Sequence, residues 1–114
     1  MFAFESLEVY SKVKVFNKEV LELIDTFKLR PYLRDQLGRA SLSIRLNIAE
    51  GSSRLTKNDK RRFLVIARGS AFECLSILEI LKERGTLAES SYLKYYNDLE
   101  QISKMLYTMI KKLE

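Results

Sequence analysis

The residues best suited to bind a ligand are the basic side chains at Lys57, Lys60, Arg61 and Arg62. They follow Thr56, and a threonine three residues before an aspartate is typical of a capping box that opens a helix. The first turn of a helix also offers unpaired backbone N–H groups, which bind phosphate readily. We therefore predict phosphate contacts in this cluster, with a merely solvated helix start as the alternative. Four more arginines are outlying candidates for the same role: Arg34, Arg45, Arg54 and Arg68.

The charge of the chain is concentrated in one stretch. The net charge is +5, yet residues 28–68 hold eleven Lys and Arg against three Asp and Glu, and the rest of the chain is mildly acidic. A contiguous basic stretch of this kind indicates an anionic partner. We expect nucleic acid, RNA or DNA, to be bound through its backbone charge. The alternative is a soluble basic protein without such a partner.

Several kinds of catalytic chemistry lack the residues that they need. The chain has no histidine, which removes histidine zinc sites, the di-iron motif of helical bundles and histidine acid–base catalysis. The single cysteine, Cys74, cannot form an internal disulfide, and its place on an apolar stripe predicts a buried thiol. No glycine-rich phosphate loop is present. We expect a protein that is not an enzyme and uses no cofactor and no metal.

Long helices must position these residues, because only four glycines and one proline are available for turns. Apolar residues recur at alternating steps of four and three, the period of a packed helix, in four successive segments. Pro31 separates the first two segments, the Thr56 cap opens the third, Gly85 stops it, and a second expected capping box at Thr86 opens the fourth. The segments span about 7–27, 33–51, 56–85 and 86–113.

Four amphipathic helices with short connections predict an all-α fold, an antiparallel up-down-up-down four-helix bundle that forms a single domain over residues 1–114. No run of about 18 uncharged apolar residues exists and the N-terminus does not resemble a signal peptide, so we expect a cytoplasmic protein without membrane contact. The stripes predicted to form the core are Val9, Val13, Phe16, Val20, Leu23 and Phe27; Leu33, Leu37, Ala40, Ile44 and Ile48; Phe63, Ala67, Ser70, Cys74, Ile77 and Leu81; and Tyr92, Tyr96, Leu99, Ile102, Leu106, Met109 and Leu113.

The second and third segments carry apolar residues on a second face as well. Helices that are apolar on two sides are buried on two sides, and a four-helix bundle has only one interior. We therefore predict self-association through this face, with scattered exposed aliphatic residues as the alternative. The predicted interface residues are Leu42, Leu46, Val65 and Phe72, with Ala49, Leu64 and Leu75 nearby.

A polar flank runs along the same two segments. In an antiparallel pair, the flank of the second segment faces that of the third, which predicts the pairs Arg39–Glu73, Ser43–Ser70 and Glu50 with Arg62 or Phe63. Gly69 and Ser70 are expected to allow a close backbone approach. The predicted interhelical hydrogen-bond network comprises Arg39, Ser43, Asn47, Glu50, Ser70 and Glu73; a carboxylate metal pair and direct partner contact are the alternatives.

The polar flank also carries a resemblance to a known family. The runs Asn-Ile-Ala-Glu-Gly at 47–51 and Ala-Arg-Gly-Ser at 67–70, with Glu73 after them, resemble the four-helix-bundle proteins encoded in intervening sequences of bacterial 23S rRNA genes, also called S23 ribosomal proteins. Related accessory variability determinant proteins of diversity-generating retroelements are basic homopentamers that bind nucleic acid and a reverse transcriptase. The resemblance implies a pentameric ring and nucleic-acid binding, without a settled role.

Two functional hypotheses follow from these patterns. The first is a non-enzymatic, homo-oligomeric scaffold protein that binds the RNA or DNA backbone. The second is a protein–protein adaptor that docks a polymerase-like or other partner without touching nucleic acid, its basic charge only steering association.

Overall fold

The computed structural model describes residues 1–114 and consists of helices only. A short 3₁₀ helix, η1, covers Ala3–Ser6, and four α-helices follow: α1 at Glu8–Thr26, α2 at Pro31–Ser52, α3 at Lys57–Glu83 and α4 at Glu89–Lys112. The predicted all-helical class is confirmed. None of the four is apolar over a stretch long enough to cross a membrane.

Two helix starts differ from the sequence predictions. Pro31 is the first residue of α2 and does not lie outside it, because a proline lacks only an N–H that the first turn would leave unpaired anyway. Thr86 does not cap α4, whose N-cap is Ala88 without a side-chain hydrogen bond. The backbone N–H groups of Thr86 and Leu87 instead donate to the carbonyl of Leu81. This segment therefore closes the end of α3.

The other two boundary signals act as predicted. The Thr56 hydroxyl accepts a hydrogen bond from the Asp59 backbone N–H at 3.1 Å and so opens α3. Gly85 follows α3 with a φ of +78°, a left-handed conformation that glycine adopts without strain.

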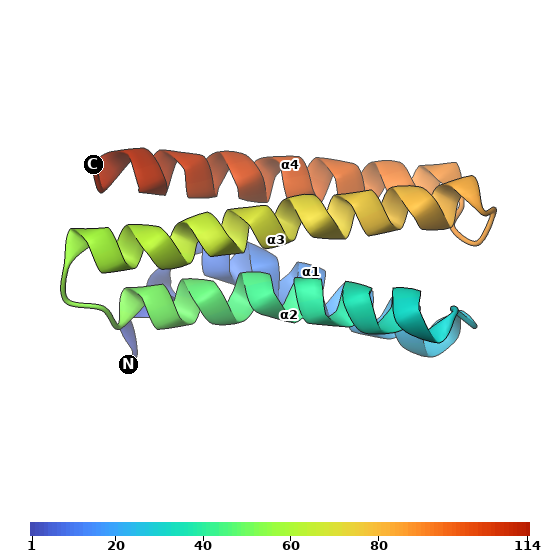
Figure 1. The fold of residues 1–114 in the computed structure, drawn as a ribbon, viewed down its shortest axis with the longest axis horizontal. Coiled ribbons are helices and arrows are strands. Elements are labelled where there is room, and N and C mark those ends of the chain that lie inside the picture. Colours follow the sequence, from blue (N-terminus) through green and yellow to red (C-terminus); the bar gives the residue numbers. More distant parts are fainter.

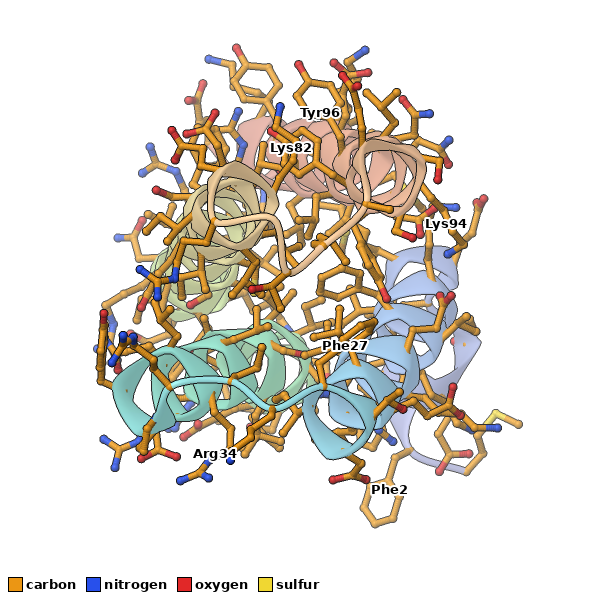
Figure 2. The ribbon with its side chains drawn as sticks, turned by 90° about the vertical axis from the view of Figure 1, so that its right-hand side faces the viewer. Phe2, Phe27, Arg34, Lys82, Lys94 and Tyr96 are labelled. Carbon is orange, nitrogen blue, oxygen red and sulfur yellow. The ribbon has the colours of Figure 1, made fainter.

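Neighbouring helices run in opposite directions, as their contacts show. Along the α2–α3 pair, Ser43 meets Ser70 and Ser52 meets Lys60, so residue numbers rise in one helix as they fall in the other. Figure 1 shows the four helices side by side, with both chain termini and the α2–α3 loop at one end. Figure 2, which looks along the bundle, shows the helices at the corners of a rough square. We call the end that holds both termini the basic end, because several Lys and Arg side chains gather there.

The interior is one apolar cluster to which all four helices contribute. Every stripe residue predicted for α2 and α3 is buried. Phe27 and Tyr96 were predicted to lie in the core, but both are exposed. Phe27 comes after the last turn of α1, where the helical period no longer sets the direction of its side chain. Leu64 was predicted near the second face but lies in the core, because α3 packs against both α2 and α4 and buries a wider arc than a single stripe.

Candidate nucleic-acid interface

The basic end collects cations from three segments of the chain. Five of the predicted phosphate-binding residues stand in the α2–α3 loop or in the first two turns of α3. Because α4 runs back toward this end, its last turn adds Lys111 and Lys112. The prediction missed both lysines, although the antiparallel topology that it proposed would have located them. The basic end therefore comprises Arg54, Lys57, Lys60, Arg61, Arg62, Lys111 and Lys112.

Phe63 holds two of these cations in place. The guanidinium carbons of Arg54 and Arg62 lie 4.6 and 4.8 Å from the centre of its buried ring. Cation–π contacts of this kind orient a guanidinium without neutralising it. Arg54 also donates to Glu50 at 2.7 Å. Glu50 therefore pairs with the loop that follows α2, and not with Arg62.

The close approach of α2 and α3 occurs at this end. A Cβ on Gly51 would lie 3.0 Å from the Phe63 Cβ and 3.4 Å from the Lys60 carbonyl oxygen. Lys60 in turn donates from Nζ to the Ser52 carbonyl at 3.2 Å, closing the last turn of α2. The close approach was predicted at Gly69, but a Cβ there would meet nothing within 4 Å.

The cations at this end differ in how far the chain itself neutralises them. Glu114 lies 3.8 Å from the Arg61 guanidinium and 3.1 Å from the Lys111 Nζ. Its hydrogen bond with Lys111 raises the pKa of that ammonium group. No carboxylate forms an ion pair with Lys57, Lys60, Arg62 or Lys112.

The remaining predicted phosphate contacts lie elsewhere. Arg34 stands at the opposite end of the bundle and pairs with Asp35 at 3.2 Å. Arg68 is halfway along α3, donates to the Ser103 carbonyl at 3.2 Å and lies against the rings of Phe72 and Tyr107. The structure thus divides the eight predicted residues, and only five share one surface.

Arg45 belongs to a polar network between α1 and α2 that was not predicted from the sequence. Its guanidinium donates to the Tyr10 hydroxyl at 3.0 Å and to the side-chain amide oxygen (Oδ1) of Asn17 at 3.3 Å. Asn17 donates in turn to the Ser41 hydroxyl at 2.8 Å. The one available signal was Asn17 itself, an amide next to Phe16 in the apolar stripe of α1. Arg45 therefore stands away from the basic end, half-buried between α1 and α2, and its contact with phosphate stays a prediction.

The predicted network between α2 and α3 forms in part. Ser43 and Ser70 share a hydrogen bond of 2.8 Å, and the Asn47 amide holds Ser43 from within α2 at 3.0 Å. Arg39 and Glu73 form no ion pair, and both are exposed. Both residues stand farther round their helices than the serines do, so solvation competes with pairing.

Cys74 is a buried thiol. It has no exposed surface and lies in the apolar cluster. Burial raises its pKa to about 12, with the Glu73 carboxylate adding to the effect. The sulfur is therefore protonated at neutral pH, and a protonated, buried thiol is a poor nucleophile.

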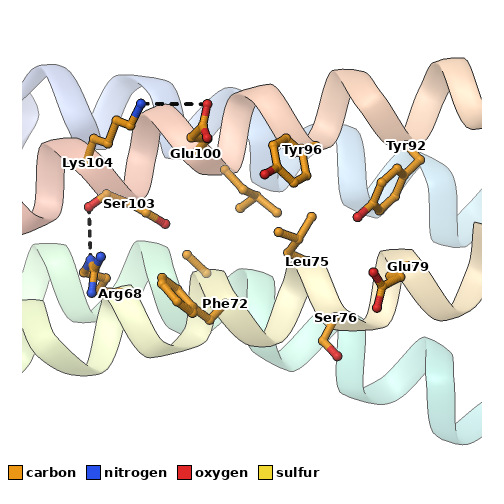
Figure 3. Close-up of a pocket in the computed structure, with 12 residues that line it drawn as sticks. Arg68, Phe72, Leu75, Ser76, Glu79, Tyr92, Tyr96, Glu100, Ser103 and Lys104 are labelled. Atoms are coloured by element: carbon orange, nitrogen blue, oxygen red, sulfur yellow. Dashed lines mark hydrogen bonds and ion pairs between the residues drawn. The ribbon is translucent and has the colours of Figure 1, made fainter.

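A second surface of different character lies along α3 and α4. A groove of about 490 Å³ runs between the two helices, bordered by aromatic and aliphatic side chains and by charges of both signs (Figure 3). Phe72 forms one edge and Tyr96 the other. The four predicted interface residues are all exposed in the single chain: Leu42 by 46%, Leu46 by 53%, Val65 by 50% and Phe72 by 56%.

These features define a class, the basic four-helix bundle with its polar seam between α2 and α3. The chain belongs to the family of 23S rRNA-intervening sequence proteins, whose family model matches residues 5–108. The predicted family is thereby confirmed.

A solved structure supports the same assignment. The chain is similar to a protein of unknown function from the S23 ribosomal protein family of Bacteroides thetaiotaomicron, known at 1.70 Å resolution. The two share 27% sequence identity with a TM-score of 0.85, over 90% of this chain and 98% of that one. No curated protein matches the sequence.

Proposed function

We propose that this protein is a non-enzymatic, homo-oligomeric scaffold of the cytoplasm that binds RNA or DNA by its backbone. The observation that carries the proposal is the gathering of seven cations at the basic end, four of them without an ion pair. A surface of unpaired cations attracts phosphate whatever the base sequence.

Self-association would strengthen such binding. The exposed apolar residues of α2 and α3 favour contact between copies, and the resemblance to homopentameric relatives suggests five. Several basic ends held in one assembly would bind a single strand together, which raises avidity without any new kind of contact. Sedimentation of the parent protein at micromolar concentration is expected to report a closed oligomer, and a monomer would refute this part of the proposal.

The nucleic-acid part is tested by removing the same charge from either end of the bundle. The variant Lys57→Gln/Arg61→Gln/Lys112→Gln removes three cations from the basic end and leaves the side-chain contacts of Phe63 and Lys60 intact. The control Lys28→Gln/Arg30→Gln/Arg34→Gln removes the same charge from the opposite end. We expect the first variant to bind unrelated sequences more weakly. Its plot of log K against log salt should be flatter by about 0.9 for each duplex phosphate that the variant no longer neutralises.

The two variants separate a binding surface from overall charge. Equal weakening in both would mean that only net charge matters, and full binding by the first would mean that the basic end is a solvated face. If the parent binds neither RNA nor DNA at low salt, the adaptor function takes its place.

The groove between α3 and α4 is the observation that favours an adaptor. Its aromatic rim and mixed charges suit a protein segment better than a phosphate backbone. Under the adaptor function, Tyr96→Glu would abolish capture of the partner in a pull-down that, for the parent protein, survives nuclease treatment.

A further inference from the structure

The exposed glycine in the middle of α3 has no explanation within its own chain. Gly69 is helical and solvent-exposed, and a Cβ added there would meet no atom within 4 Å. Glycine weakens the interior of a helix relative to alanine and is usually found where something must approach the backbone closely. At Gly51 the Phe63 side chain makes that approach, whereas Gly69 has no such neighbour.

Gly69 lies on an outward stripe formed with Val65 and Phe72, at steps of four and three residues. An outward stripe on α2 has the same spacing and consists of Leu42, Leu46 and Ala49. The two stripes differ in relief: the α3 stripe has a notch between two large side chains, whereas the α2 stripe has a large side chain at its centre. None of the six side chains is charged.

The two stripes also match in their positions along the bundle axis. The Ser43–Ser70 hydrogen bond and the Gly51–Phe63 contact fix the register of α2 against α3. In that register, Leu42 is level with Phe72, Leu46 with Gly69 and Ala49 with Val65, each within about two residues, or roughly 3 Å of helix rise.

The stripes cannot meet within one molecule, because each lies on the solvent-exposed side of its own helix. A rotation about an axis parallel to the bundle would carry the α2 stripe of one copy onto the α3 stripe of the next without changing any level. Two different surfaces joined in this way form a head-to-tail interface, which generates a ring when the rotation closes.

From this register we infer that a second copy of the chain docks on α3, with its Leu46 side chain seated over Gly69 between Val65 and Phe72. The inference rests on the self-association in the proposed function and names the surfaces that produce it. Leu42 would then pack on Phe72, and Ala49 would leave room for Val65.

Charge at the margin of the interface agrees with this arrangement. Arg39 precedes Leu42 by one turn and has no ion-pair partner in its own chain, and neither does Glu79, two turns beyond Phe72. Docking would bring this unpaired cation of one copy toward the unpaired carboxylate of the next. Arg61 and Arg68 border the notch, but the stripe positions themselves are uncharged. The match of the two apolar stripes in relief and in level therefore favours a second copy of the chain as the occupant.

The test uses two variants that each damage one half of the interface. We call the projecting Leu46 side chain of the α2 stripe the ridge. Leu46→Glu destroys the ridge and leaves the notch at Gly69, whereas Gly69→Leu fills the notch and leaves the ridge. Both positions are exposed and neither change should disturb the fold, which circular dichroism will check. Val15→Glu is the matched control, because it places the same charge on an equally exposed apolar position of α1.

Sedimentation then has a distinctive expected pattern. The parent and Val15→Glu should form an assembly of more than two copies, and each interface variant alone should be monomeric. An equimolar mixture of the two variants should form a one-to-one dimer and nothing larger, because one intact ridge meets one intact notch.

Each other outcome overturns a defined claim. If the parent assembles and either variant assembles equally well, the proposed interface is wrong while self-association stands. If the variants are monomeric but their mixture forms no dimer, the ridge does not seat in the notch. A monomeric parent would overturn self-association itself.

Discussion

The two flanks of α2 are joined to their neighbours by polar side chains, but under different conditions of burial. Toward α1, Asn17 and Ser41 are 3% and 0% exposed and link to the Arg45 guanidinium. Toward α3, Ser70 is 8% exposed and its partner Ser43 is half-buried. The α1–α2 seam thus buries Asn17 and Ser41 together, whereas Tyr10 and Arg45 at its edge are half-buried. The α2–α3 seam adds a close approach of the two helices at Gly51, where an added Cβ would lie 3.0 Å from the Phe63 Cβ.

This difference in burial predicts different costs for breaking each seam, because a buried polar group without its partner loses both the hydrogen bond and its solvation. The three predictions below concern the free energy of unfolding, measured by chemical denaturation. All use the Leu46→Glu background at one protein concentration, since association would otherwise add to the apparent stability.

Asn17→Ala should have the largest effect. It removes the acceptor of Arg45 and the donor of Ser41, and it leaves a cavity beside the core. We expect a loss of about 3 kcal/mol. Asn97→Ala, at an exposed position of α4, is the control and should change stability by less than about 0.5 kcal/mol. A cost below about 1 kcal/mol for Asn17→Ala would mean that the α1–α2 network does not stabilise the fold.

Ser70→Ala should have an intermediate effect of about 1 kcal/mol, the usual net value of one hydrogen bond. Ser43 keeps its hydrogen bond from Asn47 in this variant, so no group is left wholly unpaired. The double variant Ser43→Ala/Ser70→Ala should cost less than the sum of the two single changes, because they remove one shared bond. Strict additivity would show that the serines are adjacent but not coupled.

Glu73→Ala should have the smallest effect, below about 0.5 kcal/mol. A buried pair with Arg39 would instead cost about 3–5 kcal/mol when one partner is removed. Such a cost would show that the exposed, unpaired positions of these two residues do not represent the protein in solution.

The fold was largely predictable because the spacing of apolar residues along a helix depends only on which side of that helix is buried. The stripes of α2 and α3 were identified residue by residue, and the Thr56 cap and the Gly85 stop were recognised from their local chemistry. The errors occurred where local and tertiary signals compete. Thr86 has the composition of a cap, but its backbone N–H serves the end of α3.

The candidate site was less predictable, because a basic residue reveals little of its surroundings. Arg45 and Arg61 have the same chemistry in the sequence, yet Arg45 joins a polar network between α1 and α2, and Arg61 stands at the basic end. Only the positions of Tyr10 and Asn17, far from Arg45 in the chain, distinguish the two. Gly69 has a plausible partner within the chain when only the sequence is considered, and the absence of that partner led to the inference about a second copy.

The position of the two chain termini has a practical consequence for the design of expressed protein. Both emerge at the basic end, so a purification tag fused to either terminus would stand beside the candidate phosphate contacts. An aspartate-rich tag would compete with nucleic acid there, and a polyhistidine tag would add its own affinity for it. The turn at Gly85 lies at the far end of the molecule, and exposed turns tolerate insertions best. A label inserted at that turn would report on binding without taking part in it.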